Sequence, residues 1–272
     1  MLQAEFNIEK KRIARSFSQA AKSYDSHAAL QRKVADNLLA QLSKNAHVQR
    51  VLDLGSGTGY CTKALHRLYP NAEIINLDIA EAMLSFASNK QEGDSFKGDS
   101  VKAKSICADA EALPFIENSF DIIFSSLSIQ WCQDYAILFS ELKRILRPQG
   151  TFHISTFGPE TLQEVTQAWQ QVDSYIHVNR FQSCSFLKNE INGKGFSNNH
   201  IKIDPMLIYY QSFEKLAREL KSIGASNKNA GQGQGLSGRR KISKLKQAFE
   251  RNADEELGIP VTYQVFYVSA QS

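Results

Sequence analysis

The sequence predicts an α/β protein built on a doubly wound parallel sheet. Short apolar runs alternate with helical patterns between residues 50 and 156. The runs are almost continuous in Val, Ile and Leu, as expected of strands buried on both faces. A glycine-rich turn at residues 53–59 follows the first run, at the place where such a sheet binds its ligand. The 272 residues, 42% of them hydrophobic, suffice for one large domain with appendages.

Two helices are predicted before the first strand. Four residues recur at helical spacing in the first helix: Ile13, Phe17, Ala20 and Tyr24. Four more recur every four residues in the second: Leu30, Val34, Leu38 and Leu42. Asp25 or Ser26 is the expected N-cap of the second helix. Because no strand pattern precedes residue 48, we expect residues 1–46 to form a helical cap on a domain spanning 47–272.

The central part of the chain contains five predicted strands and the helices between them. The strands are Arg50–Leu54, Glu73–Asp78, Lys104–Ala108, Phe120–Ser125 and Gly150–Thr156. The helices are Thr58–Leu68, Ala80–Ser88 and Tyr135–Leu146. Strand–helix alternation of this kind indicates a parallel sheet covered on both faces.

After Thr156 the regular alternation of strands and helices ends. An insertion of about residues 157–200 contains a helix at Pro159–Tyr175 and then a polar stretch. The remaining elements are a strand at Ile201–Tyr210, a helix at Phe213–Leu220, a helix at Lys241–Arg251 and a strand at Val261–Val268. The loop at residues 224–238, rich in Asn, Gln and Gly, is expected to be mobile. We expect the last two strands to complete the same sheet, one of them antiparallel.

Composition excludes several classes of protein. The formal charge of +4 and pI near 8.8 are too mildly basic to indicate nucleic-acid binding. No apolar run resembles a secretory signal or reaches the length of a membrane span. The four cysteines lack a CxxC pair and are interpreted as buried residues in a reducing cytoplasm, with no metal site. His27, His153 and His177 have no obvious carboxylate or nucleophile partner in the sequence and receive no catalytic role.

The turn after the first strand, Asp53 to Gly59, predicts a binding loop. Three glycines alternate with Ser56 and Thr58 before a helix begins: Gly55, Gly57 and Gly59. Glycine is needed where a chain turns sharply or a ligand approaches the backbone. A dinucleotide fingerprint would have a third glycine where Tyr60 stands, and Asp53 would repel a pyrophosphate. The loop therefore favours a ligand with an amino group and a sulfonium over a nicotinamide dinucleotide.

Two further carboxylates follow the next strands. Asp78 ends the second strand, at the spacing expected of a ribose-binding acid. Asp109 follows the third strand, where a carboxylate can accept a hydrogen bond from the adenine amino group. With Asp53 they are predicted to form one site at the carboxyl ends of the strands. Alternatively, each is a solvated loop acid or a helix cap.

These residues resemble those of the class I S-adenosylmethionine-dependent methyltransferases, over about residues 48–157. The resemblance implies a Rossmann-like sheet of seven strands with the last one antiparallel, and S-adenosylmethionine as the methyl donor. Asp78 and Asp109 match the ribose and adenine acids of that family. Ile79 and Met83 are expected to flank the adenine, although helix packing would explain them equally well. Three further residues complete the expected donor site: Ala110, Glu111 and Ser126.

The appended segments carry a more specific resemblance. Five strings resemble the BioC family, the malonyl-[acyl carrier protein] O-methyltransferases of biotin synthesis: residues 14–31, 125–132, 167–173, 177–181 and 220–225. Ser126 stands where some relatives have Asn. The resemblance implies methylation of the free carboxylate of a malonyl thioester, held on an acidic acyl carrier protein, with S-adenosylhomocysteine as the second product. The methyl ester formed starts the pimeloyl chain of biotin.

Such a reaction needs positioning more than acid–base chemistry, because a carboxylate is already ionised at neutral pH. Arg180 is the candidate for recognising the acceptor, with a surface ion pair as the alternative. Tyr24 is expected to cap the site. Gln130 and Trp131 follow the fourth strand, where Trp131 could wall the sulfonium. Simple packing is the alternative for all three.

A basic face is expected to dock the acidic carrier. It comprises Arg218, Lys221, Arg239, Arg240, Lys241 and Lys244. A merely solvated helix face is the alternative. We expect a monomer without nucleic-acid or membrane partners. A small-molecule methyltransferase acting on a quinone or polyketide, and a non-catalytic donor-binding assembly factor, remain open.

Overall fold

The computed structural model describes residues 10–95, 103–225, 238–251 and 253–272, and they form a seven-stranded sheet of order β3-β2-β1-β4-β5-β7-β6. The strands are β1 (Arg50–Leu54), β2 (Glu73–Asp78), β3 (Lys104–Cys107), β4 (Phe120–Ser126), β5 (Leu146–Phe157), β6 (Ser197–Tyr210) and β7 (Ile259–Gln271). The first five pair in parallel, whereas β7 is antiparallel to both β5 and β6. The predicted fold class, including an antiparallel last strand, is confirmed.

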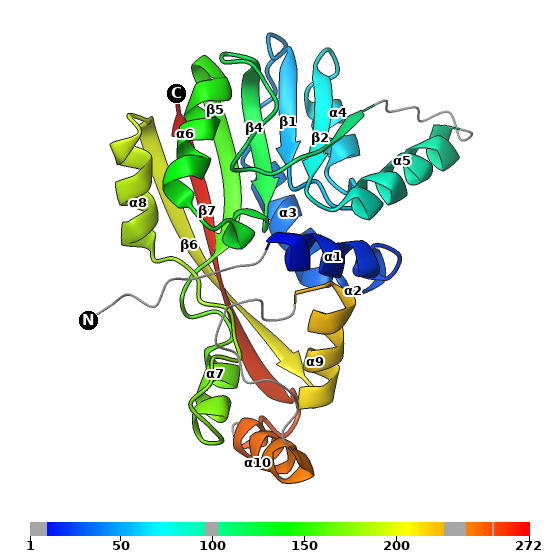
Figure 1. Cartoon of the computed structure of the whole chain (residues 1–272), viewed down its shortest axis with the longest axis vertical. Helices are drawn as coiled ribbons and strands as arrows, with labels where there is room; N and C mark the ends of the chain where they lie inside the picture. Colours follow the sequence, from blue (N-terminus) through cyan, green and yellow to red (C-terminus); the bar gives the residue numbers. More distant parts are fainter. Residues whose placement is uncertain (1–9, 96–102, 226–237, 252) are drawn as a thin grey trace.

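Helices cover both faces of this sheet (Figure 1). They are α1 (Lys10–Ala20), α2 (Tyr24–His27), α3 (Ala29–Leu39), α4 (Thr62–Leu68), α5 (Glu81–Ser95), the 3-10 turn η1 (Ile129–Trp131), α6 (Tyr135–Ile145), α7 (Gln163–Gln170), α8 (Cys184–Gly193), α9 (Phe213–Ser222) and α10 (Gly238–Glu250). One hydrophobic cluster joins α3 and α4 to the strands, and the other joins α6 and α8. Consecutive strand residues, such as Val51 and Leu52, belong to opposite clusters, because side chains alternate across a strand.

The two C-terminal strands reach beyond the rest of the sheet. β6 and β7 pair from Ser197 with Gln271 to Tyr210 with Ile259, and their far end projects past the other strands (Figure 1). Buried residues of α7, α9 and α10 pack against this ribbon in the same hydrophobic cluster as α3. The ribbon therefore carries a helical subregion next to the carboxyl ends of the parallel strands.

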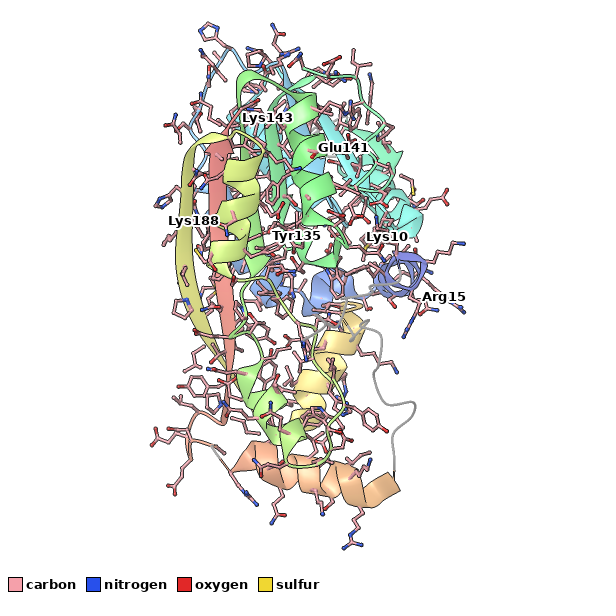
Figure 2. The ribbon with its side chains drawn as sticks, turned by 60° about the vertical axis from the view of Figure 1, so that its left-hand side comes forward. Lys10, Arg15, Tyr135, Glu141, Lys143 and Lys188 are labelled. Atoms are coloured by element: carbon pink, nitrogen blue, oxygen red, sulfur yellow. The ribbon has the colours of Figure 1, made fainter. Side chains whose placement is uncertain are left out.

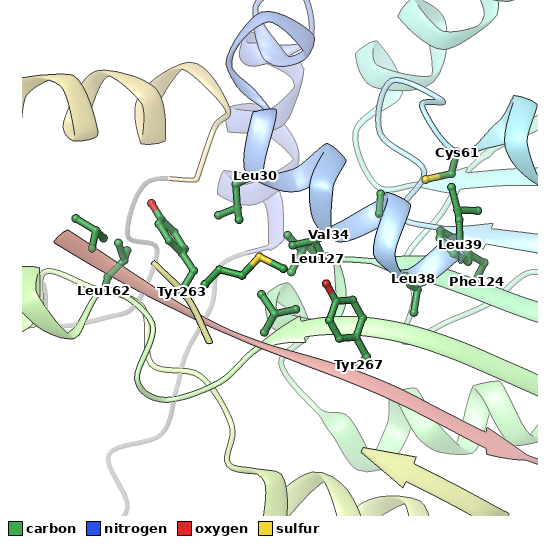
Figure 3. Packing of buried hydrophobic residues seen from close by; sticks show 14 of the residues in the cluster. Leu30, Val34, Leu38, Leu39, Cys61, Phe124, Leu127, Leu162, Tyr263 and Tyr267 are labelled. Atoms are coloured by element: carbon green, nitrogen blue, oxygen red, sulfur yellow. The ribbon is translucent and has the colours of Figure 1, made fainter. Parts of the chain in front are cut away.

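The N-terminal helices lie across those strand ends (Figure 1). Leu30, Val34 and Leu38 of α3 point toward Tyr263 and Tyr267 of β7 (Figure 3). α1 instead contributes Ala20 to a small cluster with α5. The segment predicted to form a helical cap thus packs into the main core through α3.

Three local predictions were wrong. Asp25 and Ser26 do not cap the second long helix: they lie within α2, and Ala28, which has no side chain able to cap, precedes α3. The polar stretch contains the unpredicted helix α8, capped by Ser183, whose hydroxyl accepts from the backbone N–H of Phe186. α7 is also shorter than the predicted helix. The loop expected to be mobile falls on residues 226–237, outside the described part.

The cysteine prediction was partly wrong. Cys61 and Cys132 are buried as expected, but Cys107 is exposed and Cys184 is half-buried, and all four are free thiols. None of the described helices is both long and apolar enough to cross a bilayer. The described residues also contain no group of three or more His, Cys, Asp or Glu side chains placed to hold a metal ion.

Leu38→Ala tests whether α3 belongs to the core. Leu38 is 1% exposed, so the truncation leaves a cavity and should lower the free energy of unfolding by about 2–5 kcal/mol. Urea titration followed by circular dichroism measures it. Lys33→Ala, at an exposed position of the same helix, should change the free energy by less than about 0.5 kcal/mol. Equal effects of the two substitutions would show that α3 packs loosely.

Candidate active site

The glycine loop after β1 is fixed to β2 and to the turn after β4. The backbone N–H groups of Gly55 and Ser56 donate to the Leu77 carbonyl at 2.7 and 3.0 Å. Gly55 has a φ of +72°, and an added Cβ would lie 2.2 Å from the Ser128 Cβ. Only glycine fits this position, both because of the left-handed backbone and because of the close approach.

Asp78 is held firmly at the end of β2. Its carboxylate accepts from the backbone N–H of Gly57 at 2.9 Å and from that of Ala80 at 2.8 Å. Burial raises the pKa of Asp78, and these backbone N–H bonds oppose the rise. The carboxylate faces a cavity into which it can present an oxygen to a hydroxyl group.

That cavity, which we name the adenosine pocket after the ligand that the sequence predicts there, is lined by most of the predicted donor residues. Ten of its lining residues were predicted from the sequence: Tyr24, Gly55, Gly57, Asp78, Ile79, Met83, Asp109, Ala110, Ser126 and Trp131. Lys10, Ile13 and Phe17 of α1 close it from the other side. The ends of the parallel strands and the first helix thus enclose an apolar cavity with acids at its edge.

Lys10 is a functional candidate that sequence reasoning missed. Its ammonium forms ion pairs with Asp109 at 2.5 Å and with Glu111, and it lies between α1 and the strand ends (Figure 2). Burial alone would lower the pKa of Lys10, but the hydrogen bonds to both acids raise it. Glu111 also accepts from the backbone N–H of Asp134 at 3.2 Å and does not line the adenosine pocket. In this structure Glu111 therefore holds α1 in place through its ion pair with Lys10.

A second cavity, the methionine-side pocket, lies beyond the glycine loop. It is lined by Tyr24, Gln31, Asp53, Ser56, Thr58 and Ser126, among others. Asp53 is 2% exposed, and its Oδ2 has no hydrogen-bond partner. Burial, and then the charge of Asp78, raise the pKa of Asp53 to about 7. A buried carboxylate without a partner is suited to a cationic ligand.

The other polar groups here have different tasks. The Thr58 hydroxyl donates to Asp25 at 2.6 Å, which joins the glycine loop to α2. The Ser56 hydroxyl is buried without a partner. Burial raises the pKa of the Tyr24 phenol, and Asp78 adds to the rise. Gly59 lines neither cavity and only completes the turn.

A third cavity, the acceptor pocket, lies among α7, α9 and the end of β7. Its walls are mainly apolar and aromatic, including Phe157, Leu162, Val165, Trp169, Phe181, Leu216 and Tyr263. Trp131 lines both this pocket and the adenosine pocket, and it packs edge-on against Phe17 with ring centroids 5.4 Å apart. Trp131 is therefore the wall that the two cavities share.

Gln130 both lines the acceptor pocket and stabilises the turn that carries Trp131. Its amide nitrogen donates to the Leu127 carbonyl at 2.7 Å, and its amide oxygen accepts from Thr156 at 3.3 Å. Leu127 has a φ of +49°, an uncommon conformation for a residue with a side chain. The Gln130 bond holds this conformation in place.

The structure separates Arg180 from the donor residues. Arg180 is exposed and lines a neighbouring hollow, whereas the residues beside it, Asn179 and Phe181, line both that hollow and the acceptor pocket.

His177 does have a partner, contrary to the sequence analysis. Its Nε2 lies 2.7 Å from Asp173 Oδ1, and its ring stacks on Trp169 at 3.5 Å. Both residues lie in the irregular chain beyond the end of α7, so no helical spacing in the sequence could have revealed the pair.

The predicted basic face divides between two helices. Arg218 and Lys221 are exposed on α9, and Arg240 and Lys244 are exposed on α10. Lys221 also lines the acceptor pocket. Lys241 instead lies 3.4 Å from Asp173 Oδ2. The side chain of Arg239 is outside the described residues.

The chain is similar in sequence to known methyltransferases. Residues 52–154 match the family model described as a methyltransferase domain. The chain is 37% identical to a malonyl-[acyl-carrier protein] O-methyltransferase of Gallionella capsiferriformans, over 97% of this chain and 91% of that protein. It is 43% identical to a biotin biosynthesis bifunctional protein of Cellvibrio japonicus, over 96% of this chain and 50% of that protein. The chain thus spans about half the length of the bifunctional relatives it matches.

A solved structure shares the fold. The phosphoethanolamine N-methyltransferase 2 of Haemonchus contortus, in complex with S-adenosyl-L-methionine, aligns with a TM-score of 0.58 at 18% identity. The alignment covers 94% of this chain and 57% of that protein. This chain therefore shares its overall fold with that structure.

Asp53→Asn tests the unpaired carboxylate. Because the pKa of Asp53 rises from 3.8 to about 7 on folding, the folded chain holds this proton more tightly than the unfolded chain. The ligand-free fold therefore loses stability as pH rises toward and through about 7. Asn stays neutral, so the variant should melt higher than wild type at pH 8, and the gain should shrink by pH 5. Thermal melts at both pH values measure this difference.

The same variant should bind the donor product S-adenosylhomocysteine more weakly, by about 10- to 100-fold in titration calorimetry. Asp254→Asn provides the control, because backbone N–H groups of Leu257 and Glu256 lower the pKa of that exposed acid. The control should gain no stability at pH 8 and should bind normally. If Asp53→Asn binds S-adenosylhomocysteine as tightly as wild type does, the Asp53 carboxylate does not bind the cationic group of the ligand.

Proposed function

We propose, because the chain belongs to the family of malonyl-[acyl-carrier protein] O-methyltransferases, that it transfers the methyl group of S-adenosylmethionine to the free carboxylate of a malonyl thioester on acyl carrier protein. The product would be the malonyl methyl ester that starts pimeloyl synthesis for biotin. The observation that carries the proposal is the shared wall at Trp131, which brings a donor cavity with acids at its edge against an apolar acceptor pocket.

The donor residues have distinct proposed roles. The Asp53 carboxylate pairs with the positively charged amino group of the donor. This group supplies the hydrogen-bond partner that the buried Oδ2 of Asp53 lacks. Asp78 accepts hydrogen bonds from the ribose hydroxyls. Asp109 accepts from the adenine amino group in place of Lys10. Ile79 and Met83 hold the adenine ring between them.

The transfer itself needs no general base in this proposal. The malonyl carboxylate is ionised at neutral pH and attacks the methyl group in line with the sulfur. The protein contributes alignment and exclusion of water, which can lower the barrier by about 7–11 kcal/mol at best. Trp131 places an aromatic face beside the sulfonium.

The remaining predicted residues position the reactants. Tyr24 lines both donor cavities and caps them from α2. Gln130 fixes the turn of Trp131. Arg180 lines the hollow next to the acceptor pocket, and Asn179 and Phe181 line both. Arg180 is proposed to contact the malonyl thioester from that hollow.

The carrier protein is proposed to dock on α9 and α10. Acyl carrier proteins are acidic, so exposed Arg218, Arg240 and Lys244 offer a complementary face. Lys221 joins that face to the acceptor pocket, so a prosthetic arm attached to a docked carrier can enter there. A monomer acting in the cytoplasm completes the proposal.

Mass spectrometry of malonyl-carrier incubated with the protein and S-adenosylmethionine tests the function. We expect a mass gain of one methyl group, and none with acetyl-carrier, which has no free carboxylate. Methylation of a carrier-free quinone or polyketide but never of the carrier would favour a small-molecule methyltransferase. Donor binding without any transfer would favour a non-catalytic assembly factor.

Lys244→Glu tests the docking face. Reversing this exposed charge on α10 should raise KM for malonyl-carrier about 3- to 10-fold with little change in kcat. Activity on malonyl-pantetheine, which lacks the carrier protein, should not change. Lys188→Glu reverses an equally exposed charge on α8, at another face of the molecule (Figure 2), and should leave KM unchanged. Equal effects of both substitutions would place docking elsewhere.

A further inference from the structure

Gln31 lies at the junction between the donor and acceptor halves of the site. It belongs to the first turn of α3, directly after the core residue Leu30. Within the described ranges, Gln31 alone lines both the methionine-side pocket and the acceptor pocket. Trp131 alone lines both the adenosine pocket and the acceptor pocket. Gln31 and Trp131 therefore flank the place where the two reactants meet.

The side-chain oxygen of Gln31 lacks a hydrogen-bond partner at this junction. Its side-chain oxygen is fully buried and makes no hydrogen bond, which is unfavourable for a polar atom in a packed interior. A glutamine amide can turn over, so that either its oxygen or its NH2 group faces the cavity. The next residue, Arg32, is engaged elsewhere, because its guanidinium donates to the Asp25 carbonyl. Gln31 thus presents a polar group that a bound molecule can satisfy.

We propose that Gln31 binds the acceptor carboxylate and orients it for attack. Its NH2 group donates to one carboxylate oxygen, while the other oxygen forms a bond to the methyl carbon. The carbon–sulfur bond breaks at the same time, its electron pair stays on the sulfur, and a neutral thioether leaves without any proton transfer. This role rests on the proposed function, which supplies the carboxylate acceptor.

A neutral amide suits this task better than a cation. A guanidinium would bind the carboxylate more strongly but would withdraw charge from the attacking oxygen. An amide donor fixes the orientation and leaves most of the negative charge on the nucleophile. The apolar walls around Phe157 and Leu216 exclude water, so the one hydrogen bond from Gln31 carries the orientation.

Two substitutions of Gln31 test the proposal in the full chain. Gln31→Leu keeps the size of the side chain and removes the NH2 group, so kcat on malonyl-carrier should fall about 10- to 100-fold. The affinity for S-adenosylhomocysteine should change less than about threefold. Gln31→Glu should lose more activity at pH 8, where its charge repels the acceptor. It should recover toward wild type as the pH falls to 6, because a protonated carboxyl donates a hydrogen bond.

Gln41→Glu is the matched control, since Gln41 is exposed just beyond the same helix. It should methylate malonyl-carrier as wild type does, with no altered pH profile. If Gln31→Leu keeps the wild-type kcat, or loses affinity for S-adenosylhomocysteine as steeply as it loses kcat, Gln31 does not bind the acceptor. If wild type and Gln41→Glu both fail to methylate malonyl-carrier, the proposed function itself is wrong.

Discussion

The contact between the glycine loop and the turn after β4 determines how the two halves of the site meet. Gly55 has no side chain, so the backbone of one turn lies against Ser128 in the other. The hydroxyls of Ser125 and Ser128 both donate to the Leu54 carbonyl, at 2.8 and 3.1 Å. The turn that surrounds the donor and the turn that carries Trp131 are therefore joined into one rigid unit. Any movement of one displaces the other.

The cavities on either side of this unit differ in their electrostatics. The donor side contains buried acids, of which Asp53 has an unpaired oxygen, and it attracts a cation. The acceptor side is apolar and aromatic, so an anion that enters it is desolvated and more reactive. In the proposed reaction, a cation and an anion therefore approach each other beside Trp131 in an environment with little water to screen them.

Most of the parallel core could be predicted from the sequence, because β1, β2 and β4 are short, mainly apolar runs that are largely buried. The ends of β1 and β2, and with them Asp53, were predicted correctly for this reason. The helix α8 was missed because only Leu187 and Ile191 are buried in it. The roles of Lys10 and Gln31 could not be predicted. They depend on how α1 and α3 pack over strands that are distant in sequence; Lys10 and Asp109 are 99 positions apart.

The position of β7 within the sheet also determines when each part of the protein can form during synthesis. The pairs that build the donor cavity, among β1 to β4, are complete in the chain before residue 127. The acceptor pocket needs Tyr263 of β7 and the ribbon that β7 makes with β6. Because a domain folds as a unit, and because α3, which lines the methionine-side pocket, packs on Tyr263 and Tyr267 of β7, the donor half also depends on β7. The acceptor pocket cannot form until β7 has been synthesised, so the active site is complete only after β7 has been translated.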